Sequence, residues 1–174
     1  SEKTIMGHTV THLLLQALRD ILGNHVFQSG SNITSERVRF DFNFDRNLTI
    51  DEIKKVEEIV NEKIKDNLKV HFEMMPLSKA KKIGAIGLFD EKYQDNVKVY
   101  FIGPSTRSAR SGHSTLRDEP SGSDSKRRLS TDRPYSIEFC GGPHVDFTSK
   151  LKKFKIIKQE NIGKGQRRLY SIVG

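Results

Sequence analysis

The sequence predicts an α+β fold, a mainly antiparallel sheet packed with two long helices, in a single domain with a long mobile insertion. Three observations lead to this prediction. Apolar residues recur at helical spacing in two long segments and alternate with polar residues in several short ones. A polar stretch, residues 105–134, interrupts this pattern. The chain has 174 residues, enough for one sizeable domain.

The two long helices are predicted from their apolar stripes and their ends. Residues 3–22 carry apolar side chains from Leu13 to Leu22 at helical spacing, and Gly23-Asn24 supplies the stop. Thr49-Ile50-Asp51-Glu52 fits a capping box, which opens a helix that runs to about Asn67.

The strands are predicted from alternation. Residues 26–33 and 38–44 form two strands around a turn at Thr34-Ser35-Glu36, and the second strand places three phenylalanines on one face. A short helix is predicted near 78–82. Six further strands are predicted at 69–75, 97–102, 135–139, 145–147, 154–158 and 169–173.

The segment 105–134 is rich in Ser, Arg, Lys, Asp and Gly, and Leu116 and Leu129 are its large apolar residues. Such a segment buries too little apolar surface to offset its ordering entropy, so we expect a mobile insertion. Its basic cluster Lys126-Arg127-Arg128 contacts RNA or is simply solvated. His113 within it is expected to be an ordinary loop residue.

Composition limits the class of protein. The formal net charge is +8 and the sequence pI is about 9.6, which favours an acidic partner such as nucleic acid, although solubility alone is an alternative. A single cysteine excludes a disulfide within the chain and fits a reducing compartment. No apolar run reaches the roughly 18 residues of a membrane span, and the start does not have the pattern of a signal peptide. We therefore expect no membrane partner and a cytoplasmic protein, with an organelle as the alternative.

Two short clusters predict a metal site. His8 and His12 are four residues apart in HTVTH and share one face of the predicted helix. Cys140 and His144 are four apart in CGGPH, where Gly141 and Gly142 allow a sharp turn. Three imidazoles and one thiolate form a complete tetrahedral ligand set for Zn²⁺. The alternative is a surface histidine pair and a small buried cysteine. No Glu lies between the two helical histidines, so this is not the zinc-protease pattern HExxH.

The HTVTHLLLQALRDILG opening, the QSGS segment, RFDF, FDEKY and CGGPHV together resemble the editing domain of alanyl-tRNA synthetases. Free-standing alanyl-tRNA editing proteins and the threonyl-tRNA synthetase editing domain share this plan. The resemblance covers nearly the whole chain apart from about 105–134. Most alanyl enzymes have Thr where Pro143 stands, and Pro there is more typical of the threonyl family. The closing GKGQRRLYSIVG is again similar to the alanyl type.

The resemblance implies hydrolysis of the ester that joins a wrong amino acid, Ser or Gly, to the 3′-terminal adenosine of tRNA(Ala). It implies that Thr11 contacts the amino-acid side chain in the pocket, whereas Thr9 is expected to be an ordinary helix residue. It also implies a pocket role for Gln28, with a side chain on the strand surface as the alternative. Asp41 either supports a histidine ligand or pairs with Arg39 across the strand face. Lys164, Arg167 and Arg168 are candidates for tRNA phosphate contacts or a solvated basic turn. His25 and His71 are expected to be structural.

Two other functions stay open at this point. The chain could be a zinc-ordered module that binds tRNA without catalysis, or a threonyl-type editing domain acting on Ser-tRNA(Thr). The resemblance also implies that the segment is covalently part of a larger synthetase and is monomeric as a fragment.

Overall fold

The computed structural model describes residues 1–87, 96–104 and 133–174, and it confirms the α+β class with antiparallel strand pairing. The predicted insertion lies outside the described residues up to 132, as do its basic cluster, His113 and the FDEKY stretch. The elements are α1 (Glu2–Leu22), β1 (Gln28–Ile33), β2 (Val38–Asn43), α2 (Ile50–Lys65), β3 (Val70–Pro76), α3 (Leu77–Lys82), β4 (Asn96–Ile102), β5 (Ser136–Phe139), the 3₁₀ helix η2 (Thr148–Leu151), β6 (Phe154–Gly163) and β7 (Gln166–Val173).

The chain divides into two compact units. The first consists of residues 1–68 and 141–174, and the second of residues 69–140. The strands accordingly form two sheets, with the order β1-β2-β7-β6 in the first unit and β3-β4-β5 in the second. Alternation predicted most of the strands, but it carries no information on which sheet each strand joins.

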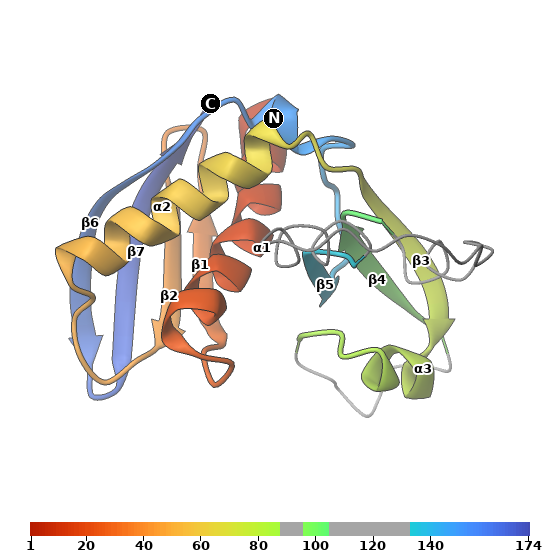
Figure 1. The fold of residues 1–174 in the computed structure, drawn as a ribbon, viewed down its shortest axis with the longest axis horizontal. Helices are drawn as coiled ribbons and strands as arrows, with labels where there is room; N and C mark the ends of the chain where they lie inside the picture. The colour runs from red at the N-terminus through yellow and green to blue at the C-terminus, as the bar shows by residue number, and fades with distance from the viewer. Residues whose placement is uncertain (88–95, 105–132) are drawn as a thin grey trace, which may run out of the picture. The chain divides into compact units, whose positions relative to one another are not determined.

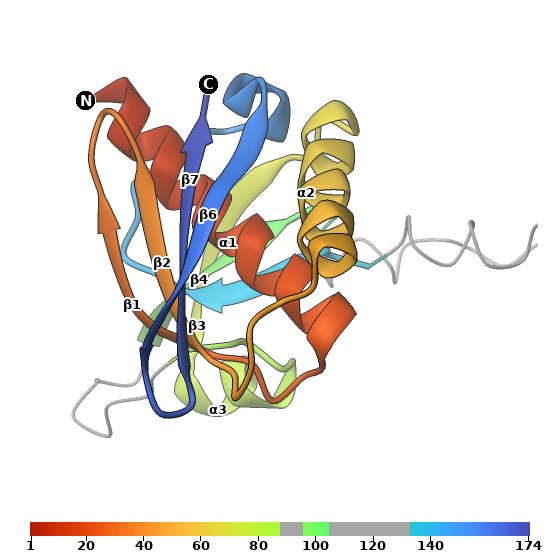
Figure 2. The same ribbon diagram turned by 90° about the vertical axis from the view of Figure 1, so that its left-hand side faces the viewer.

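In the first unit, α1 and α2 pack on one face of the sheet (Figures 1 and 2). The inward positions of the strands supply the core, which includes Phe40, Phe42, Phe154 and Leu169, all fully buried. Helix α2 is fixed to β6 through Asn61, whose side chain donates to the Phe154 carbonyl at 2.8 Å and accepts from the Phe154 amide at 2.9 Å. This packing forms a rigid base for α1.

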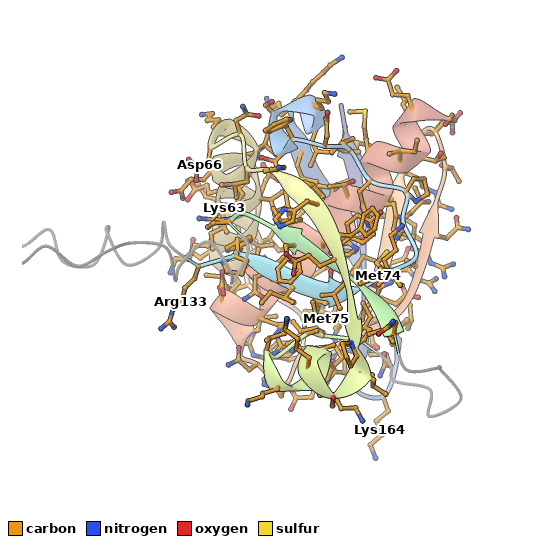
Figure 3. All side chains as sticks on the ribbon, turned by 90° about the vertical axis from the view of Figure 1, so that its right-hand side faces the viewer. Lys63, Asp66, Met74, Met75, Arg133 and Lys164 are labelled. Carbon is orange, nitrogen blue, oxygen red and sulfur yellow. The ribbon has the colours of Figure 1, made fainter. Side chains whose placement is uncertain are left out.

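The ends of both long helices follow the local signals. The capping box at Thr49 is confirmed: its hydroxyl accepts from the Glu52 amide at 3.1 Å, and the Glu52 carboxylate accepts from the Thr49 amide at 2.9 Å. Lys63 and Asp66 lie side by side at the other end of α2, with 3.9 Å between Nζ and Oδ2 (Figure 3). In the described part of the chain, no helix is both long and apolar enough to cross a membrane.

In the second unit, α3 packs on one face of the β3-β4-β5 sheet. The buried members of this core are Met75, Ala80, Ala85, Val97, Val99 and Phe101. Met74 is 58% exposed and Met75 is 3% exposed, which is the alternation expected of a strand with one covered face (Figure 3). A single parallel bridge between Ile86 and Glu138 extends the sheet.

The predicted strand at 145–147 is wrong. Residues 141–147 form a loop with one isolated bridge residue, Phe147, and η2 begins at Thr148. Within the loop, the Val145 amide donates to the Thr9 side chain. The β6–β7 hairpin is longer than predicted, so Arg167 and Arg168 lie on β7 and only Lys164 lies in the turn.

Candidate metal centre

Helix α1 presents two histidines on one face. The ring centroids of His8 and His12 are 5.8 Å apart, as expected for residues one turn apart. His12 is buried and His8 is half-buried. The preceding residue, Gly7, lets the helix approach the sheet, because a Cβ there would lie 2.5 Å from Cγ2 of Ile33. The pair is therefore seated on a closely packed part of α1.

His144, on the loop 141–147, meets both of these rings. Its ring centroid lies 4.4 Å from that of His8 in a stacked arrangement and 4.5 Å from that of His12 in an edge-on one. The loop turns at Gly142, whose φ of +71° is accessible to glycine without strain. Two sequence-distant segments of the first unit thus bring three imidazoles together.

Cys140 completes the predicted group. It is the residue joined directly to Gly141, where the chain enters the loop, and is four residues from His144. The possible ligand atoms of His8, His12, Cys140 and His144 all lie within 4.8 Å of one another. This cluster could hold a metal ion, and a set of three imidazoles and one thiolate suits Zn²⁺.

The hydrogen bond made by His8 fits such a role. Its Nδ1 lies 3.2 Å from the carbonyl oxygen of Pro143. Because a carbonyl oxygen can only accept, the neutral His8 ring carries its proton on Nδ1 and its lone pair on Nε2. Metal-bound histidines usually donate their second ring N–H in this way, which fixes the tautomer and the ring orientation.

Thr9 and Thr11 differ in what their hydroxyl groups contact. The Thr9 hydroxyl lies 3.0 Å from Nδ1 of His144, 3.2 Å from the Ile5 carbonyl and 3.1 Å from the Val145 amide. Thr11 donates to the His8 carbonyl at 2.7 Å. Both are buried. The sequence favoured Thr11 over Thr9 for a site role, but it is Thr9 that contacts a histidine ring of the cluster.

Asp41 lies in a cross-strand ion pair. Its carboxylate accepts two bonds from the Arg168 guanidinium, at 2.8 and 3.1 Å, and Arg39 Nη2 lies 3.5 Å from the same group. The hydrogen bond to Asp41 raises the pKa of Arg168 above its ordinary value. Arg39 pairs with Asp41, as one of the two alternatives anticipated. The sequence did not predict that Arg168 would be the partner of Asp41, because this pairing depends on the register of β2 against β7.

The other predicted site residues are dispersed. Gln28 is exposed at the first position of β1. Lys164 is exposed at the tip of the β6–β7 hairpin (Figure 3). Arg167 is buried and donates to the Asn161 side chain at 3.0 Å. The proposed roles of Gln28, Asp41 and the basic residues remain predictions.

The two remaining described histidines outside the cluster have aromatic partners in the fold. His25 stacks on Phe44 with a centroid distance of 6.0 Å. His71 stacks on Phe101 at 5.4 Å, and burial lowers the pKa of His71 below its ordinary value. Both contacts agree with the structural roles expected of these residues.

Comparison with known proteins shows which family the chain resembles. Residues 97–170 match the family model of the threonyl and alanyl tRNA synthetase second additional domain. The chain is 45% identical to alanine–tRNA ligase of Treponema denticola over 173 residues. The aligned region covers 99% of this chain and 24% of that protein. The chain is 45% identical over 171 residues to the Borrelia garinii enzyme, covering 98% and 24%. The Listeria monocytogenes enzyme is 41% identical over 172 residues, covering 99% and 16%.

These matches confirm the resemblance seen in the sequence. Residues 97–170 are similar to the second additional domain of these synthetases, and over nearly its whole length the chain is similar to a segment of alanine–tRNA ligases. It spans only about a sixth to a quarter of the length of these relatives.

Proposed function

We propose that this segment edits mischarged tRNA(Ala) by hydrolysing the ester that joins Ser or Gly to the 3′-terminal adenosine. The observation that carries the proposal is the cluster His8, His12, Cys140 and His144, within a segment similar to alanine–tRNA ligases. We propose further that the cluster binds Zn²⁺, that the acceptor end of tRNA is the partner, and that the protein acts in the cytoplasm.

The chemistry requires a water held beside the ester carbonyl and stabilisation of the charge that develops on its oxygen. When bound, Zn²⁺ would order the pocket, or would polarise a ligand at an open coordination position. An aminoacyl ester is labile, so positioning of the substrate supplies much of the acceleration. Gln28 and Asp41 stay candidates for orienting the water or a ligand.

Thr11 offers a physical basis for choosing serine. Because its hydroxyl proton goes to the His8 carbonyl, the Thr11 oxygen acts as an acceptor toward a substrate. The serine hydroxyl can donate to it, whereas the methyl group of alanine cannot. Sites built around a substrate hydroxyl reject analogues that lack it by large factors. This contact selects serine alone, because glycine, like alanine, has no hydroxyl to donate.

The test is deacylation of Ser-tRNA(Ala), Gly-tRNA(Ala) and Ala-tRNA(Ala) by the chain and by two variants. His8→Ala should abolish release of serine, and His25→Ala, a histidine outside the cluster, should not. Preferential release of Ser and Gly supports editing. No release above the uncatalysed rate, with tRNA still bound, would instead support the binding module. Release confined to Ser-tRNA(Thr) would support the threonyl type suggested by Pro143.

A further inference from the structure

We propose that Thr9 is a positioning residue, whose hydroxyl selects the Nδ1–H tautomer of His144 and anchors the loop 141–147 on α1. Its importance for metal binding rests on the proposed function, but its effect on the histidine does not. The proposal starts from an unusual density of contacts: one fully buried hydroxyl lies within 3.2 Å of a carbonyl, a ring nitrogen and a backbone amide.

The partners of this hydroxyl determine where the protons lie. The Val145 N–H can only donate, so it occupies one lone pair of the Thr9 oxygen. The Ile5 carbonyl can only accept, so it takes the single hydroxyl proton if it is bonded at all. In that arrangement Nδ1 of His144 must donate its N–H to the second lone pair of Thr9.

The alternative arrangement makes fewer bonds at the Thr9 hydroxyl. If Thr9 donated to Nδ1 of His144, its side-chain bond to the Ile5 carbonyl would be lost, leaving the hydroxyl with two bonds instead of three. The arrangement with three bonds at Thr9 is therefore favoured. It places the His144 proton on Nδ1 and the lone pair on Nε2. His144 is thereby held in the tautomer that the Pro143 carbonyl imposes on His8.

The two contacts are reciprocal. His8, on the helix, donates to the backbone of the loop, and His144, on the loop, donates to a side chain of the helix. The Val145 amide adds a second bond from the loop to Thr9. The tautomers that a cation requires are therefore selected by groups that are not themselves ligands, before any cation binds.

The first test is made without metal. Long-range ¹H–¹⁵N correlation spectra of the 174-residue chain near pH 8, where free imidazole is neutral, report which nitrogen of His144 carries the proton. We expect Nδ1–H in the wild type and in Thr9→Ser. In Thr9→Val, which keeps the shape but removes the acceptor, the Nε2–H population should rise. An Nε2–H wild type overturns the proposal even if Thr9→Val does not fold, and an unchanged tautomer in a folded Thr9→Val also overturns it.

The second test measures Zn²⁺ affinity by competition with a chromophoric chelator. Thr9→Val should bind about 10–100-fold more weakly, as for other residues that orient histidine ligands, and Thr9→Ser should restore most of the affinity. Thr4→Val, which removes another α1 hydroxyl whose bonds are to Ser1, should leave the affinity close to wild type. Equal affinity in Thr9→Val and wild type overturns the positioning role. A wild type that binds no Zn²⁺ refutes the proposed metal site and leaves the tautomer result to stand by itself.

Discussion

Thr148 joins the end of α2 to the 3₁₀ helix that follows the loop 141–147. We expect its hydroxyl group to raise the Tm of the protein by several degrees. The side chain is fully buried. Its hydroxyl donates to the Lys63 carbonyl at 2.7 Å and accepts from the Leu68 amide at 2.8 Å. Thr148→Val keeps the shape of the side chain and removes both bonds.

The magnitude follows from the two groups left behind. Lys63 lies in the last turn of α2, where carbonyls lack a partner within the helix, and the Leu68 amide lies in a part-buried connection. Leaving a buried donor or acceptor unsatisfied costs about 1–3 kcal/mol. Because the Lys63 carbonyl and the Leu68 amide are in part-buried surroundings, we expect a total loss of about 2–3 kcal/mol. For a chain of this size that corresponds to a decrease in Tm of roughly 4–12 °C.

The assay is urea and thermal unfolding followed by circular dichroism, with Thr148→Ser as the control. The serine variant keeps both hydrogen bonds and loses only a methyl group, so its loss should be about 1 kcal/mol. A Thr148→Val protein whose unfolding free energy is within about 0.5 kcal/mol of wild type would behave like a neutral surface variant. That result would show that the two hydrogen bonds do not hold this junction.

Three further predictions concern metal content, the buried ion pair and acid stability. The chain should bind about one Zn²⁺, and Cys140→Ala should retain less metal by elemental analysis; unchanged retention would remove Cys140 from the ligand set. Asp41→Asn leaves the Arg168 charge only partly compensated and should lower the unfolding free energy measured in urea, by less than for a fully buried pair because Arg168 is partly exposed. The hydrogen bond from Arg46 lowers the pKa of Glu52 from 4.5 to about 2. Its stabilisation is therefore present above pH 4.5 and lost as the pH falls toward 2, and Glu52→Gln should flatten that part of the stability curve.

The sequence predicted features that local residues determine. The ends of α1 and α2 differ from the prediction by one or two residues, because capping residues and apolar spacing act within a turn. The histidine and cysteine cluster was also predictable. Two pairs at four-residue spacing indicated a common centre, and the resemblance to a known family supported it.

The features that the sequence did not predict depend on the register of distant strands and on individual hydrogen bonds. Asp41 and Arg168 are 127 residues apart and meet only because β2 and β7 pair in one particular register. The predicted strand at 145–147 is absent because the Val145 amide bonds to the Thr9 side chain and η2 begins at Thr148. Three residues carry too little alternation to reveal this.

Thr9 shows why a candidate ligand set is not yet a site. The spacing of His8 and His12 places two rings on one face of α1, but it does not determine which ring nitrogens carry protons. That is determined by the Pro143 carbonyl for His8 and, as we propose, by the Thr9 hydroxyl for His144. A second, purely structural anchor lies four residues after His144, where Thr148 ties the end of the loop to α2. The loop is thus held by Thr9 and by Thr148, neither of which is a predicted ligand. A variant that keeps all four predicted ligands and lacks only the Thr9 hydroxyl should therefore lose affinity.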